Sequence, residues 1–454
     1  MEKESIRRLR VHPAVFYRQY DDYLILYHTG QKKVFTLTET AGDILDCFHE
    51  FCTAEKAVAR LKQIYQVDDI AEFEKSIMDF IREMVEKDIL WQEYKQAVHI
   101  DTLENRISRN FTGSSHLYSA TLELTYKCNE NCRHCYVAEK KKRELTTLEI
   151  RTLLDELYDL NVFNLIFTGG EIFTRKDSFD ILEYAYSKRF LIDIFTNGTL
   201  LDGNDFIRLK KCQPRCVHFS VYSHIPQKHD AITRVPGSFE KTINAIEACT
   251  VIDIPVNIKT PIFNETIDDI QGMVSLAEAL SASIELGQNI TPKKNGDLKP
   301  TELKISGEEK DDRVHYAIKN LIKTIENGTS KKQVSDHLCG AGEHSISINP
   351  YGEVYPCSLL QICIGDITKQ TVREIWDESD GLKWWRRNNR RSLKKGCSGC
   401  DLAQRCVFCP GEAMMRKGDP LAMYEDACLA TKYVVNRESK KGGKENGAKF
   451  ENLY

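Results

Sequence analysis

The sequence lacks the long apolar runs and the charge excess that mark membrane proteins and many nucleic-acid-binding proteins. Nothing in its 454 residues approaches the roughly 18 uncharged apolar residues of a membrane span. The opening MEKESIRRLR has no apolar stretch that could serve as a signal peptide. A formal net charge of −4 gives no indication of a nucleic-acid partner. We therefore expect a cytoplasmic protein that binds neither membrane nor nucleic acid.

Cysteine, in contrast, is abundant, with 16 residues in the chain. In a reducing compartment such thiols are better candidates for metal ligands or buried residues than for disulfides. Cys128, Cys132 and Cys135 lie close together and are followed at once by Tyr136. Three thiolates can hold three irons of a cubane [4Fe-4S] cluster and leave the fourth iron open. A structural zinc ion would need a fourth ligand, and only the intervening His134 is near.

Residues 1–100 predict a small α+β module. Strand-like runs cover residues 15–22, 23–30 and 32–39, and helical periods cover 41–48, 57–64 and 73–85. Three strands followed by three helices favour a unit of winged-helix type. The polar residues 101–117 then suit a linker.

From residue 118 onward the pattern alternates regularly between strands and helices. Strand-like runs cover residues 121–127, 164–170, 191–198, 217–223, 256–263 and 283–290. Thr146 and Glu149 predict a capping box at the start of the first intervening helix. Six βα units in series imply an α/β fold, a parallel sheet forming a partial (β/α)6 barrel over residues 118–330. The chemistry of such sheets lies at the carboxyl ends of the strands.

Residues 331–436 hold most of the remaining cysteines and predict a metal-organised domain. Its ligand-like positions are Cys339, Cys357, Cys397, Cys400, Cys406, Cys409 and Cys428. A hairpin with its turn at residues 349–352 connects the first two of these cysteines. The Cys-x2-Cys pairs alone would also suit zinc. Residues 437–454 predict a disordered tail, and the final ENLY resembles the start of a protease-site linker added for expression.

The spacing of the first three cysteines, in the loop after the first strand of a βα series, resembles the radical S-adenosylmethionine (SAM) superfamily. The resemblance implies that Cys128, Cys132 and Cys135 hold a [4Fe-4S] cluster that binds SAM. TGGEIF matches the GGE segment of the family, although Ile172 replaces the usual proline. By the same resemblance, the expected cofactor-binding residues are Tyr136, Gly169, Gly170, Glu171, Asn197, Ser220 and Arg234.

The third region resembles the SPASM domain, which carries auxiliary iron-sulfur clusters in peptide-modifying members of that superfamily. The resemblance implies one fully ligated [4Fe-4S] cluster on Cys397, Cys400, Cys406 and Cys428. A second would lie on Cys339, Cys357 and Cys409, with its last iron open or capped by Cys363. The expected total is therefore three [4Fe-4S] clusters. The last cysteine pair is separated by two residues, where the family usually has three.

The first module resembles the PqqD-like peptide-recognition element. In that family the leader of a ribosomally made precursor peptide adds as an extra strand, and here the groove would lie between residues 33–38 and 73–85. A DNA-binding winged helix is the alternative, but the module is not strongly basic.

Together the resemblances imply a radical SAM enzyme that modifies a ribosomally made precursor peptide. It would receive an electron from a donor such as flavodoxin or ferredoxin, cleave SAM reductively and abstract hydrogen from the peptide. We expect a crosslink, with a Cys-derived thioether favoured because an open auxiliary iron could bind a substrate thiolate. The alternatives are a carbon-carbon crosslink, epimerisation, formylglycine formation and a zinc-bearing, non-enzymatic peptide adaptor.

Overall fold

The computed structural model describes three stretches of the chain. They are residues 9–92 except 13, 21–22, 29–30, 32, 49–51 and 66–68; residues 116–305 except 139–141 and 288–289; and residues 338–428 except 390–391, 394–396, 398–399, 403–405 and 407. Most of the predicted linker, the boundary near residue 330 and the predicted tail lie outside these residues. The chain divides into two compact units, of which the first contains residues 1–114 with 161–163 and 189–191.

The N-terminal module has the predicted order of three strands and three helices. Strands β2 (Val15–Tyr20), β3 (Tyr23–His28) and β4 (Lys33–Thr38) form an antiparallel sheet in that order. Helices α1 (Glu39–Asp46), α2 (Ala54–Ile64) and α3 (Ile70–Glu86) follow. A short antiparallel pair, β1 (Leu9–Val11) with β5 (Leu90–Gln92), was not predicted and joins the two ends of the module.

The sheet and helices of this module share one apolar core. Leu24 and Leu26 of β3 pack with Leu45 of α1, Leu61 of α2 and Ile81 of α3. These residues recur at strand and helix spacing, which is why the sequence predicted the elements. Within the described residues β4 pairs with β3 and with no other strand, so its second edge is available to a further strand.

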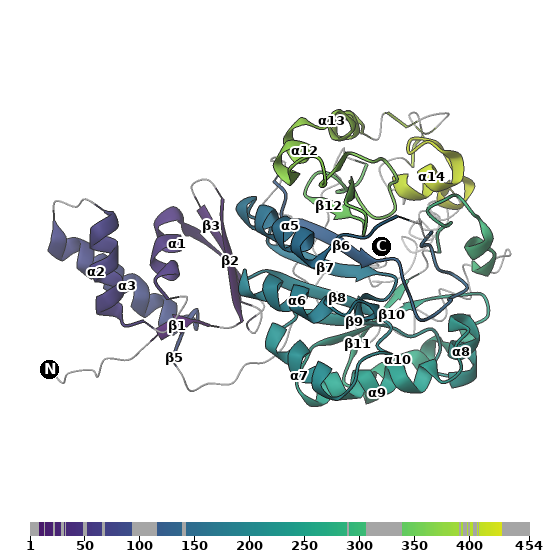
Figure 1. Cartoon of the computed structure of the whole chain (residues 1–454), viewed down its shortest axis with the longest axis horizontal. Helices are drawn as coiled ribbons and strands as arrows, with labels where there is room; N and C mark the ends of the chain where they lie inside the picture. The colour runs from purple at the N-terminus through teal and green to yellow at the C-terminus, as the bar shows by residue number, and fades with distance from the viewer. Residues whose placement is uncertain are drawn as a thin grey trace, which may run out of the picture. The chain divides into compact units, whose positions relative to one another are not determined.

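The second unit contains the predicted barrel. Strands β6 (Ser119–Thr125), β7 (Asn164–Gly169), β8 (Leu191–Thr196), β9 (Cys216–Ser220), β10 (Val256–Pro261) and β11 (Ser283–Gly287) lie side by side in sequence order. The helices α5 (Thr147–Asp159), α6 (Ser178–Ser187), α7 (Gly203–Cys212), α8 (Pro226–Thr233), α9 (Ser238–Val251) and α10 (Ile270–Ala279) lie along the outside of the strands (Figure 1). The capping box of Thr146 and Glu149 is confirmed at the start of α5.

The third region extends the same sheet. The predicted hairpin is formed by β12 (Ser345–Ile348) and β13 (Glu353–Tyr355), and β14 (Gly365–Asp366) pairs with β13. Strand β12 runs parallel to β6, so the sheet of the described residues has nine strands (Figure 1). Gly352 has a φ of 88° in the turn, a conformation that glycine adopts without strain.

Short helices complete the second unit. They are the 3-10 turns at Ile172–Thr174, Ile267–Asp269 and Lys299–Leu303 and the helices α12 (Val372–Glu378), α13 (Asp380–Arg387) and α14 (Pro410–Lys417). No helix in the described parts of the chain combines the length and the apolar character needed to cross a membrane.

Candidate metal centre

The first three cysteines lie in the loop that follows β6, which we call the cysteine loop (residues 126–136). Backbone N-H groups of Asn131 and Arg133 donate to the carbonyl oxygens of Thr233 (3.1 Å) and Ile232 (3.0 Å) at the end of α8. Burial raises the pKa of all three thiols, that of Cys128 to about 11. The raised pKa values mean that burial opposes ionisation of the thiols. Because the thiolate is the form that binds metal, a bound cation would offset the free-energy cost of burying its charge.

The two glycines of the GGE segment allow the backbone after β7 to run directly against the cysteine loop. A Cβ atom at Gly169, where φ is 141°, would lie 2.2 Å from the carbonyl oxygen of Thr125. A Cβ atom at Gly170 would lie 2.2 Å from the carbonyl oxygen of Lys127. Glycine is therefore required at both positions. The N-H groups of Gly170 and Glu171 donate to those same oxygens at 2.7 and 2.8 Å.

Glu171 joins the ends of β7 and β8. Its carboxylate is 1% exposed and accepts hydrogen bonds from the backbone N-H of Asn197 (2.7 Å) and the hydroxyl of Thr196 (2.8 Å). Burial raises the pKa of Glu171, and these donors oppose the rise. The side-chain amide of Asn197 donates to Asn129 of the cysteine loop at 3.0 Å. The structure thus brings Glu171 and Asn197 together beside the cysteines.

Ser220 and Arg234 also lie at this edge of the sheet. Ser220 ends β9 and lies two residues before Tyr222. The hydroxyl of Tyr222 in turn lies 3.9 Å from the sulfur of Cys132. Arg234 is exposed and directly follows Thr233, whose carbonyl oxygen holds the cysteine loop. Both predicted residues therefore border the loop.

His134 was considered in the sequence only as a possible zinc ligand. Its ring packs 4.7 Å from that of Tyr222 and 5.1 Å from that of Phe263. Burial lowers its pKa to about 4, so the ring is neutral at pH 7. Within the described residues its Nδ1 atom is buried and has no hydrogen-bond partner. A buried polar atom without a partner fits a site that a polar cofactor completes.

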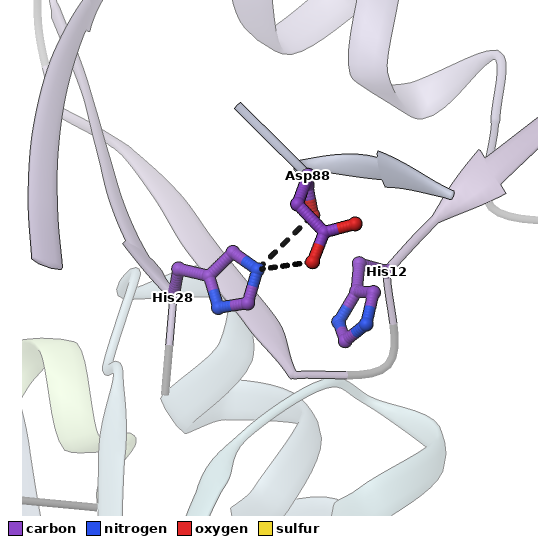
Figure 2. Close-up of side chains that lie close together, drawn as sticks. All are labelled: His12, His28 and Asp88. Carbon is purple, nitrogen blue, oxygen red and sulfur yellow. Dashed lines mark hydrogen bonds and ion pairs between the residues drawn. The ribbon is translucent and has the colours of Figure 1, made fainter. Parts of the chain in front are cut away.

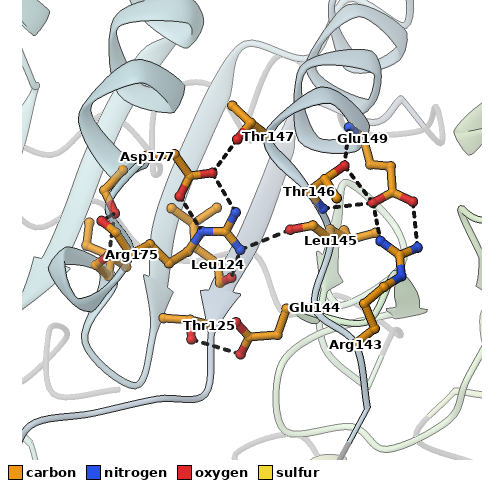
Figure 3. Close-up of polar contacts among 12 residues, drawn as sticks. Leu124, Thr125, Arg143, Glu144, Leu145, Thr146, Thr147, Glu149, Arg175 and Asp177 are labelled. Carbon is orange, nitrogen blue, oxygen red and sulfur yellow. Dashed lines mark hydrogen bonds and ion pairs between the residues drawn. The ribbon is translucent and has the colours of Figure 1, made fainter.

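The base of the cysteine loop is held by a polar network (Figure 3). Arg175 donates to the carbonyl oxygens of Leu124 (3.1 Å) and Leu145 (3.0 Å) and pairs with Asp177. Glu144 accepts hydrogen bonds from Thr125 (2.8 Å) and from the backbone N-H of Tyr126 (3.1 Å). The network therefore connects the residues after the GGE segment with the end of β6.

The cysteines of the third region fall into two sets. Burial raises the pKa of Cys339 to about 12, and its nearby thiols are Cys357 and Cys409. Burial also raises the pKa of Cys397, and the thiols near it are those of Cys428, Cys406 and Cys400. Cys363 is exposed, and its thiol donates to the carbonyl oxygen of Gly365 at 3.4 Å.

Comparison with known families identifies each of the three parts. Residues 122–277 match the model of the radical SAM superfamily, residues 339–401 that of an iron-sulfur cluster-binding domain termed SPASM, and residues 23–90 that of coenzyme PQQ synthesis protein D, or PqqD. The barrel matches the radical SAM superfamily. The SPASM and PqqD-like domains flank it at the positions predicted from the sequence. Cys128, Cys132 and Cys135 lie within the radical SAM match, and Cys339 begins the SPASM match.

Several known proteins resemble this chain. The AdoMet-dependent heme synthase of Methanosarcina barkeri is 26% identical over 325 residues, which cover 66% of this chain and 93% of the synthase. The subtilosin biosynthesis protein AlbA of Bacillus subtilis is 28% identical over 310 residues, which cover 64% of this chain and 67% of AlbA. The structure of Streptococcus suis SuiB bound to its precursor peptide SuiA matches with a TM-score of 0.61 and 14% identity. The match covers 92% of this chain and 99% of the SuiB chain. The last match shows a shared fold.

A further set of ligand-type side chains lies in the PqqD-like module. Among the described residues, His12, His28 and Asp88 are the three whose ligand atoms lie within 4.8 Å of one another (Figure 2). The Nδ1 atoms of His12 and His28 accept hydrogen bonds from the backbone N-H groups of Ala14 (3.0 Å) and Gln31 (3.3 Å). A histidine that binds a metal through one ring nitrogen instead donates a hydrogen bond from the N-H of its other ring nitrogen.

The hydrogen bonds therefore identify these three residues as a clamp of the module, not as a metal site. Because both Nδ1 atoms accept, the protons of the neutral rings lie on Nε2. The Nε2 atom of His28 is 3.0 Å from the carbonyl oxygen of Asp88. The clamp connects the end of β1, the end of β3 and the turn before β5.

The clamp predicts that the module loses stability in acid. Burial, followed by the charge of His28, lowers the pKa of His12 from 6.5 to about 4. The folded state therefore binds fewer protons than the unfolded state between these pH values. The contribution of neutral His12 to the free energy of unfolding is complete above pH 6.5 and is lost as the pH falls toward 4. It is worth about 3 kcal/mol. Hydrogen exchange of β3 amides at pH 7 and at pH 4.5 measures it. His12→Asn can keep an acceptor for Ala14 without titrating, and an unchanged pH dependence in that variant would contradict the prediction.

Proposed function

We propose that the protein is a radical SAM maturase that modifies a ribosomally made precursor peptide. The observation that carries the proposal is the attachment of a PqqD-like module, with an available strand edge at β4, to a radical SAM barrel. A leader peptide could pair with that edge between β4 and α3. AlbA and SuiB, which act in subtilosin biosynthesis and bind a precursor peptide, support this choice.

The heme synthase relative is the competing indication. Its similarity covers 66% of this chain, and heme synthesis gives no physical reason for a strand-pairing module with an available edge. A peptide substrate uses every part of the chain, because its leader would occupy the module and its core would reach the barrel. We therefore favour the peptide.

The residues around the cysteine loop fit a [4Fe-4S] cluster and SAM. When bound, the two supply a carbon-centred radical that removes a hydrogen atom from the substrate. A donor such as a flavodoxin or ferredoxin would provide the electron. Gly169 and Gly170 keep the backbone close to the cysteine loop, while Asn197, Ser220 and Arg234 would orient SAM. Tyr222 and Phe263 surround Cys132 and His134 with aromatic rings, which exclude water.

We propose two auxiliary clusters in the SPASM domain, making three in all. Cys397, Cys400, Cys406 and Cys428 would ligate one cluster fully. Cys339, Cys357 and Cys409 would leave one iron of the other open to a substrate thiolate. A thioether would then form with loss of two hydrogen atoms from the peptide. One would be abstracted from carbon, the thiol proton would be released, and an auxiliary cluster would supply the acceptor for the remaining electron.

Incubation of the anaerobically reconstituted enzyme with SAM, a reductant and a leader-bearing, Cys-containing peptide tests this function. A thioether lowers the peptide mass by two hydrogens and removes one alkylatable thiol. A carbon-carbon crosslink gives the same mass loss but leaves the thiol, and epimerisation changes neither. If no leader-bearing peptide among those encoded beside the gene is modified, while a porphyrin is, the heme synthase alternative replaces the proposal.

The open iron predicts that Cys363 is dispensable. Cys363 is exposed, and its thiol is hydrogen-bonded to the carbonyl oxygen of Gly365. Cys363→Ala should therefore keep full iron content and crosslinking within about twofold, because surface substitutions usually change little. Iron analysis and peptide mass measure this, and Cys357→Ala, which removes a proposed ligand, is the matched comparison. A changed auxiliary-cluster resonance signal in peptide-free Cys363→Ala would identify Cys363 as the fourth ligand.

A further inference from the structure

A buried polar cluster joins the first strand of the barrel, the cysteine loop and the segment after β11. At its centre the ammonium of Lys294 donates to both carboxylate oxygens of Glu123, at 2.7 and 2.6 Å. The hydroxyls of Tyr126 (2.7 Å) and Tyr136 (3.4 Å) donate to the same carboxylate. The side chains of Lys294 and Glu123 are only 8% and 1% exposed. We call these four residues the Glu123 cluster.

The contacts of Lys294 exclude a role in binding substrate directly. An ammonium has three N-H donors. Two point to Glu123, and the third points to the hydroxyl of Tyr126 at 2.9 Å. All donors are therefore used within the protein. A buried ion pair of this kind contributes little net stability but is costly to break, because the remaining charge is left buried without a partner.

The Glu123 cluster also contacts two segments that carry ligands of two proposed metal centres. The backbone N-H of Lys294 donates to the carbonyl oxygen of Tyr136 at 2.9 Å, one residue after Cys135. The ring of Tyr126 meets that of Tyr351, in the hairpin turn before Cys357, edge-on at 5.6 Å. The Glu123 cluster therefore contacts the residue after Cys135 in the cysteine loop and the hairpin turn that precedes Cys357.

We propose that the Glu123–Lys294 ion pair is a positioning unit that holds the cysteine loop at a fixed place relative to the ligand set of Cys339, Cys357 and Cys409. The pair acts by fastening three separate segments, and it does not touch substrate. The proposal rests on the proposed cluster assignments. Peptide modification needs both centres at fixed positions on either side of the substrate. SAM cleavage needs only the centre at the cysteine loop. Loss of the pair should therefore separate the two activities.

The test uses the full-length protein, reconstituted anaerobically, with the variants Lys294→Met, Glu123→Gln and the double variant. We expect each variant to retain its iron and to lose about 10- to 100-fold in modified peptide per SAM cleaved, the usual range for residues that orient metal ligands. SAM cleavage without peptide should fall by much less. Because the two residues act as a pair, the double variant should be no worse than the single variants. The paramagnetic interaction between the reduced clusters should change in all three.

Arg215→Met is the matched control. Arg215 and Asp193 form an equally buried ion pair, 10% and 2% exposed, near the amino ends of β8 and β9. This control should lower the unfolding temperature and leave cluster interaction and the activity ratio unchanged. Identical behaviour of Lys294→Met and Arg215→Met would overturn the proposal, as would additive losses in the double variant. If wild-type enzyme modifies no peptide, the proposed function fails, and the cluster interaction still tests the positioning role.

Discussion

Replacing Cys128, Cys132 and Cys135 together by alanine should remove about a third of the iron and abolish SAM cleavage. The three proposed cubane clusters would give about 12 irons per chain, and only one of them would depend on these thiolates. Its unique iron is where SAM would bind, so no electron can reach SAM without it. Iron analysis of the reconstituted protein and detection of 5'-deoxyadenosine by chromatography measure the two effects.

Cys212→Ala provides the control for this prediction. Cys212 is completely buried on α7 and lies outside every proposed ligand set. Its replacement should leave iron content and SAM cleavage unchanged, although stability falls with the lost packing. Stoichiometric zinc with little iron in wild-type protein would contradict the iron-sulfur assignment, because zinc cannot supply an electron.

A chain that begins at residue 101 should keep SAM cleavage but lose modification of a leader-bearing peptide by about 100-fold or more at low peptide concentration. The proposed SAM site lies in the barrel, whereas the proposed leader groove lies between β4 and α3. A 100-fold loss corresponds to about 2.8 kcal/mol of binding free energy. Peptide turnover by mass spectrometry and peptide-free production of 5'-deoxyadenosine measure the two activities separately.

A leaderless peptide distinguishes leader binding from damage to the barrel. Full-length and truncated enzyme should modify it at the same slow rate, because it cannot use the module. Retained SAM cleavage shows that the truncated barrel is intact. Equal turnover of the leader-bearing peptide by both enzymes would show that the module has another role.

Local patterns in the sequence were sufficient for most elements. The run at residues 121–127 predicted β6, which is observed at Ser119–Thr125. The predicted end of this strand lies two residues beyond the observed end. The reason is that Tyr126 continues the apolar pattern, although the backbone has already left the sheet for the cysteine loop. Thr146 with Glu149 predicted the start of α5 correctly, because a capping box involves only neighbouring residues. The cysteine spacing and the GGE segment indicated the radical SAM barrel for the same reason.

A charged residue within an apolar run marks a place where prediction from the sequence was incomplete. Glu123 interrupts the run TLELTYK, and a buried carboxylate needs a partner. Its partner Lys294 is 171 residues away, so no local pattern could identify it. The predicted SAM contact Tyr136 likewise has its hydroxyl directed to Glu123. Its role toward SAM stays a prediction.

The sequence by itself determined the three parts of this protein, the order of most of their strands and helices, and the cysteines available as ligands, because each depends on periodicity or spacing within a few residues. Only the tertiary structure decided which distant segments meet. It placed β12 beside β6 and joined Glu123 to Lys294. These contacts depend on how the chain closes around a shared core, and the free energy of that packing is a property of the whole barrel.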